Sequence, residues 1–74
     1  MKLTDFQKSE IKRLYDNNTL DTTDLGEIVE MIVDTTIDND IVDFSDDEDG
    51  DMYEAYTNIV WDMIESWEDE KQQN

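Results

Sequence analysis

A long stretch of single-sign charge constrains this chain more than any other feature of its sequence. From Leu14 to Glu70 there is no Lys or Arg, and this stretch holds every carboxylate except Asp5 and Glu10. With 22 acidic and 5 basic side chains and no His, the 74 residues carry a formal charge of -17. A small domain has little stability to set against such self-repulsion, so the charge predicts a salt-dependent fold or a dimer.

Apolar residues recur at helical spacing along the chain, which favours a folded domain over disorder. There is no Pro, no repeat and no low-complexity tail. Helix-start signals and periodicity predict helices at about 5–16, 24–38 and 46–70. We therefore expect a single all-α domain over residues 1–74, a small three-helix bundle that leaves open whether the helices pack within one chain or across a dimer.

The first two predicted helices have clear start signals. Thr4 with Gln7 makes a capping box, after which an apolar side is expected to gather Phe6, Ile11, Leu14 and Tyr15. Asp24 precedes the second helix, whose β-branched run "IVEMIVDTTI" would suit a strand by propensity. Its spacing of three and four residues favours a helix instead. The apolar link 41–44 is expected to lie under the core.

The third predicted helix begins in the acidic run "FSDDEDGDMYEAY". Ser45 with Glu48 forms a second capping box, and further carboxylates would lie in the first turn, where the helix dipole stabilises anions. An apolar stripe follows on one side of this helix: Met52, Tyr56, Ile59, Val60, Met63, Ile64 and Trp67. At 100° per residue the opposite side carries Asp51, Glu54, Asn58, Asp62, Glu65 and Asp69.

Metal and enzyme chemistry find little support in this sequence. An EF-hand alignment that takes Gly50 as the turn glycine puts Ser45 at position one and Tyr56 at position twelve, where Asp and a bidentate Glu are needed. With no His, no Cys and no Gly-rich phosphate loop, nucleophilic and phosphoryl-transfer schemes lack their parts. We expect no catalytic residue, no metal site and no cofactor.

The acidic side suggests a protein that presents charges as DNA does. Neighbours three and four residues apart on a helix lie about 5–6 Å from one another, comparable to the spacing of phosphates along a strand. The expected partner is a bacterial DNA-binding protein with a basic cleft, without direct binding to nucleic acid or membrane. The predicted partner-binding residues are Asp47, Glu48, Asp49, Asp51, Glu54, Trp61, Asp62, Glu65 and Asp69. An ordinary solvated helix face or adaptation to high salt would also give acidic residues here.

Trp61 falls on the charged side of the third predicted helix rather than on its apolar stripe. It could pack against the first helix or the 41–44 link, or it could be an exposed anchor at the centre of an interface. Both interpretations remain open from the sequence, and Tyr53 raises the same question.

In size, charge, absence of Cys and acidic helical faces the chain resembles the small phage-encoded proteins that mimic DNA. The resemblance implies a stoichiometric inhibitor, often dimeric, acting in the host cytoplasm. It also implies targets such as a nucleoid protein, RNA polymerase, a restriction or CRISPR nuclease, or a repair enzyme. A different interpretation is an acidic adaptor or regulatory subunit that binds through an apolar helix face. Rising salt should weaken mimicry more than apolar docking.

Overall fold

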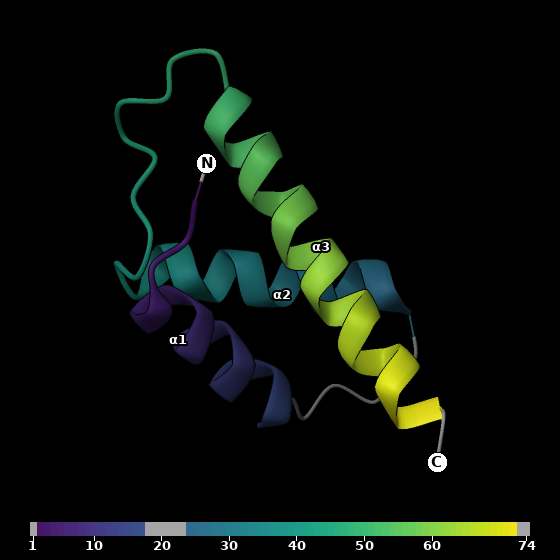
Figure 1. Cartoon of the computed structure of the whole chain (residues 1–74). Coiled ribbons are helices and arrows are strands. Elements are labelled where there is room, and N and C mark those ends of the chain that lie inside the picture. The colour runs from purple at the N-terminus through teal and green to yellow at the C-terminus, as the bar shows by residue number, and fades with distance from the viewer. Residues whose placement is uncertain (1, 18–23, 73–74) are drawn as a thin grey trace.

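The protein is a bundle of three helices, described here from a computed structural model that covers residues 2–17 and 24–72 (Figure 1). The helices are α1 (Asp5–Asp16), α2 (Leu25–Asp38) and α3 (Asp51–Gln72). No strand occurs in the described part of the chain, and the predicted all-α bundle is confirmed. None of the described helices is both long and apolar enough to cross a bilayer.

The start of α1 is the capping box predicted from the sequence. The Gln7 backbone N–H donates to Thr4 Oγ1 at 3.1 Å, and the Thr4 backbone N–H donates to Gln7 Oε1 at 2.9 Å. The same Gln7 amide also donates from Nε2 to the carbonyl of Ile41 at 3.2 Å. One side chain therefore caps α1 and ties it to the segment that follows α2.

Helix α2 begins after Asp24, whose carboxylate accepts the Gly26 backbone N–H at 2.9 Å. Its buried side chains repeat with the helical period predicted for it: Ile28, Val29, Ile32, Val33 and Thr36. The helix ends in a Schellman arrangement, in which Ile41 N–H donates to Thr36 O at 2.9 Å and Asp40 N–H to Ile37 O at 3.1 Å. Asp40 takes the left-handed position with φ 58°, a conformation that Asp tolerates better than most residues.

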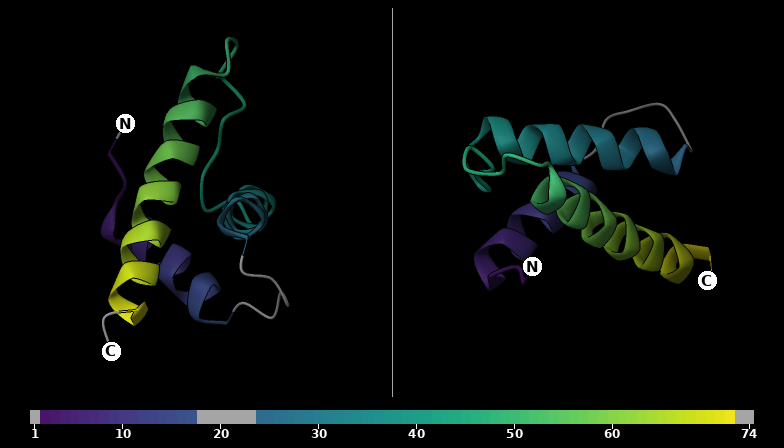
Figure 2. Two further views of the ribbon diagram at one scale, coloured as in Figure 1. Left: turned by 90° about the vertical axis from the view of Figure 1, so that its right-hand side faces the viewer. Right: turned by 90° about the horizontal axis from the view of Figure 1, so that it is seen from above.

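The core lies where α2 crosses α3, and α1 packs beside this crossing, mainly against α2 (Figure 2). Its members with no exposed area come from all three helices: Ile11, Ile32, Thr36, Tyr56, Val60 and Ile64. Two of these are polar, and the hydroxyls of Thr36 and Tyr56 satisfy each other at 2.7 Å. Val42 is also buried, as expected for the link between α2 and α3.

The predicted start of α3 is wrong by five residues. Ser45 does not cap a helix; its backbone N–H donates to Asp43 Oδ1 at 2.9 Å in a local turn. Gly50 has φ 76°, a left-handed conformation that interrupts any helix running through it. The helix starts at Asp51, and Asp47 caps it from the loop by accepting the backbone N–H groups of Met52 at 3.3 Å and Tyr53 at 3.0 Å.

Two side chains expected in the core lie at the surface. Phe6 is 62% exposed because at 100° per residue it is 140° from Ile11 and 180° from Tyr15, so the three cannot share a side of α1. Met52 is 47% exposed although it lies only 40° from Tyr56 around α3. It belongs to the first turn of α3, which in Figure 1 extends past α2 toward the loop.

Candidate partner-binding surface

The carboxylates predicted along α3 form one exposed face of that helix. Tyr56, Val60 and Ile64 are fully buried and point into the bundle, which turns the opposite side of the helix to solvent. The exposed residues on that side, named here the acidic face, are Asp51, Glu54, Asn58, Asp62, Glu65 and Asp69. From Asp51 to Asp69 the face runs about 27 Å at the helical rise of about 1.5 Å per residue.

No cation in the described part of the chain pairs with the acidic face. Both ion pairs found there lie within α1: Lys12 with Asp16 at 3.3 Å, and Arg13 with Glu10 at 2.7 Å. The carboxylates of the acidic face are therefore presented to solvent without an ion pair to any cation of the described chain. A surface of this kind attracts cationic partners over distances of about a Debye length, which is about 8 Å at physiological ionic strength.

Three of the predicted partner-binding residues lie in the loop before α3, residues 46–50, named here the acidic loop, and they divide into two kinds. Glu48 and Asp49 are exposed, but they lie on the loop before α3 rather than on its first turn. Asp47 is half-buried, and both of its carboxylate oxygens accept backbone N–H groups of α3. Asp47 therefore holds the end of the acidic face in place, whereas Glu48 and Asp49 extend its charge beyond the helix.

Trp61 lies at the border of the acidic face, 38% exposed. Its indole N–H donates to Glu65 Oε2 at 3.1 Å. A Cβ added at Gly26 would lie 3.6 Å from the outer ring carbons of the indole, so the ring rests on the first turn of α2. The structure therefore places the indole against the first turn of α2, and the part that remains exposed lies beside Glu65.

A hydrogen-bonded turn sits in the loop ahead of α3. The backbone and side chain of Ser45 hydrogen-bond the Asp43 carboxylate and hold its pKa below the usual range. The Asp47 backbone N–H donates to Phe44 O at 3.0 Å, and the Phe44 ring contacts those of Tyr53 and Tyr56, with centroids 6.1 Å and 5.3 Å away. These contacts attach the loop to α3.

Metal binding has no assembled site in the described residues. Across 2–17 and 24–72, no group of three or more carboxylates is arranged so that it could hold a metal ion. The acidic loop spreads its carboxylates outward, apart from Asp47, which serves the helix start.

Sequence reasoning missed two surface features. One is a second row of exposed carboxylates on α2, at i, i+3, i+7 and i+11: Glu27, Glu30, Asp34 and Asp38. The spacing of these four carboxylates in the sequence was sufficient to predict that they share one side of α2.

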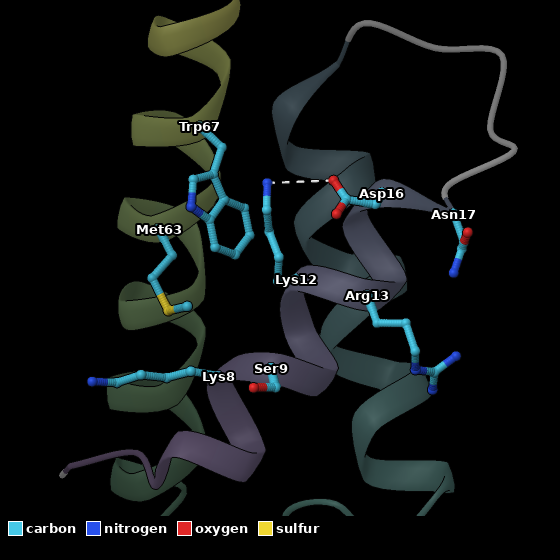
Figure 3. Close-up of a pocket in the computed structure, with 8 residues that line it drawn as sticks. All are labelled: Lys8, Ser9, Lys12, Arg13, Asp16, Asn17, Met63 and Trp67. Carbon is cyan, nitrogen blue, oxygen red and sulfur yellow. Dashed lines mark ion pairs between the residues drawn. The ribbon is translucent and has the colours of Figure 1, made fainter.

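The other missed feature is a groove of about 770 Å³ between α1 and α3, where Lys12 lies over the Trp67 ring, with Nζ 4.7 Å from its centroid (Figure 3). The residues on its two walls are at least 46 positions apart, from Asn17 to Met63, so no local pattern could reveal it.

The apolar stripe of α3 is largely used inside the bundle. Tyr56, Val60 and Ile64 have no exposed area, and Ile59, Met63 and Trp67 are half-buried. Met63 and Trp67 keep part of their area at the surface, and the most exposed large apolar side chains in the described part of the chain are Phe6, Met52, Tyr53 and Trp61. These are distributed over the starts of α1 and α3 and the middle of α3.

No protein-family model, curated protein or solved structure matches this chain.

Proposed function

We propose that the protein is a noncatalytic DNA mimic that occupies the cationic DNA-binding site of a bacterial protein and blocks its access to DNA. The observation that carries the proposal is the acidic face of α3. It is exposed along its whole length and pairs with no cation of the described chain. Ordinary surfaces mix both signs of charge to limit self-repulsion, so a one-sign face is costly unless a partner uses it.

The dimensions of the face suit a short length of one DNA strand. About 27 Å of helix corresponds to roughly eight phosphates at a rise of about 3.4 Å each. Asp51, Glu54, Asp62, Glu65 and Asp69 supply five carboxylates over that distance. Each could accept hydrogen bonds from Lys or Arg side chains that otherwise bind phosphate oxygens. Glu48 and Asp49 continue the charge beyond the first turn.

Trp61 supports the same proposal as an anchor. Trp is enriched among residues that carry most of an interface's binding energy, especially when the free protein already holds it in place. The indole is braced by Gly26 and by the hydrogen bond to Glu65, so little freedom is lost when a partner covers its exposed part. The net charge of -17 would steer a basic partner toward this surface before contact.

The test is capture of target proteins from a bacterial lysate on the tagged protein, followed by release with duplex DNA and, separately, with rising salt. We expect a DNA-binding protein to be released by DNA. Retention of all captured proteins despite DNA and high salt would contradict mimicry and favour an adaptor with an apolar contact.

Two matched sets of neutralising substitutions identify the face. The first set removes charge from α3: Asp51→Asn, Glu54→Gln, Asp62→Asn and Glu65→Gln. The control set removes the same charge from the second row on α2: Glu27→Gln, Glu30→Gln, Asp34→Asn and Asp38→Asn. We expect the α3 set to lose DNA-releasable binding and the α2 set to retain most of it, with helicity preserved in both. Equal losses would show that total charge, rather than the acidic face, determines binding.

A further inference from the structure

The groove between α1 and α3 has a cationic rim. Lys8 and Lys12 line its α1 wall, and Met63 and Trp67 line its α3 wall (Figure 3). Lys12 is paired with Asp16, but Lys8 forms no ion pair with any described residue, and its side chain extends from α1 across the lower end of the groove toward α3 (Figure 3). Such a groove suits an apolar side chain that is flanked by carboxylates.

A segment with that chemistry lies at the other end of α3 on the same chain. Met52 is 47% exposed and follows directly on the exposed carboxylates Glu48, Asp49 and Asp51. Its apolar side chain is flexible and adapts to irregular surfaces. The charge of this segment is opposite to that of the groove rim.

The positions of the two features around α3 also match. Met52 and Met63 are eleven residues apart, which is three turns, so they lie within about 20° of each other around the helix and about 16 Å apart along it. A two-fold axis that passes between them would bring Met52 of each copy to the groove of the other. Each contact is then made twice, as in a closed dimer.

We propose that the groove between α1 and α3 binds the Met52 end of a second copy of this chain, with Lys8 facing the carboxylates of the partner's acidic loop. The two copies repel each other through their net charge, but salt screens that repulsion beyond about 8 Å at physiological ionic strength. The apolar contact of Met52 with Met63 and Trp67 of the second copy is insensitive to screening. Self-association is therefore weakest at low salt and strengthens toward physiological salt.

The experiment is sedimentation velocity on the untagged full chain, over a wide concentration range at low and at physiological salt. Lys8→Glu removes the cationic rim, and Met52→Gln removes the anchor while keeping side-chain length and helix propensity. Each is expected to weaken dimerisation by about tenfold at physiological salt. Lys2→Glu makes the same charge change outside the groove and is expected to leave dimerisation within about twofold of the unsubstituted chain.

A monomer at every concentration and salt would overturn the proposal. A dimer that Met52→Gln does not weaken, or that Lys2→Glu weakens as much as Lys8→Glu, would also overturn it. Circular dichroism on each variant establishes that the helices are retained, which is expected because all three side chains are exposed. No target protein takes part in this experiment, so its outcome is separate from that of the DNA-mimic test.

Discussion

The buried hydroxyl pair of Thr36 and Tyr56 allows one prediction to be worked out from the geometry. Thr36 Oγ1 lies 2.8 Å from the carbonyl of Val33 and 2.7 Å from the hydroxyl of Tyr56, and both side chains have no exposed area. Because Thr has one hydroxyl proton, donation to the Val33 carbonyl requires Tyr56 to be the donor in the second bond. The pair is therefore directional.

The direction predicts unequal effects of removing each hydroxyl. Tyr56→Phe leaves an acceptor unfilled at Thr36 and should lower the free energy of unfolding by about 1 kcal/mol. Thr36→Val leaves the Tyr56 O–H without a buried acceptor and should lower it by about 2–3 kcal/mol. In the double variant neither hydroxyl is left without its partner. The decrease in its free energy of unfolding should therefore be smaller than the sum of the two single-variant decreases by about 1 kcal/mol.

Urea unfolding followed by circular dichroism measures these differences through the midpoint at constant m-value. Additive losses within about 0.3 kcal/mol would refute the coupling between the two hydroxyls. A larger loss for Tyr56→Phe than for Thr36→Val would refute the assigned direction of the bond. A three-helix domain of this size is expected to have only about 5 kcal/mol of stability, so each effect is a large fraction of the whole.

Two further predictions concern the start of α3 and alkaline pH. Asp47→Ala should lower the free energy of unfolding by about 1 kcal/mol, as for loss of a helix cap, whereas Asp46→Ala should change the urea midpoint little; equal effects would contradict the cap. Burial raises the pKa of Tyr56 above its usual value of 10.0, so the stability this residue contributes is present below that pH and is lost as pH rises through the folded pKa. The urea midpoint should therefore fall above about pH 10, and a fall just as steep in Tyr56→Phe would rule out this residue as a source.

The limits of α1 and α2 could be predicted because the interactions that set them are local. Thr4 and Gln7 are three residues apart, and the apolar period of α2 extends over most of the helix. The start of α3 was harder because two local signals compete. Ser45 with Glu48 fits a capping box, while the fold uses Asp47 as the cap and a left-handed Gly50. The contacts of Phe44 with Tyr53 and Tyr56 favour the second arrangement, and those contacts are tertiary.

The acidic face follows from the sequence alone, because the helical period that buries Tyr56, Val60 and Ile64 necessarily exposes the residues opposite them. The sequence by itself therefore determined the three helices, the charge of the surface and which side of α3 carries it. The surroundings of Trp61 and Lys12 required the tertiary structure. Trp61 rests on Gly26 of α2, and Lys12 of α1 lies over Trp67 of α3. Both contacts join segments distant in sequence, and packing of the core decides which of those segments meet.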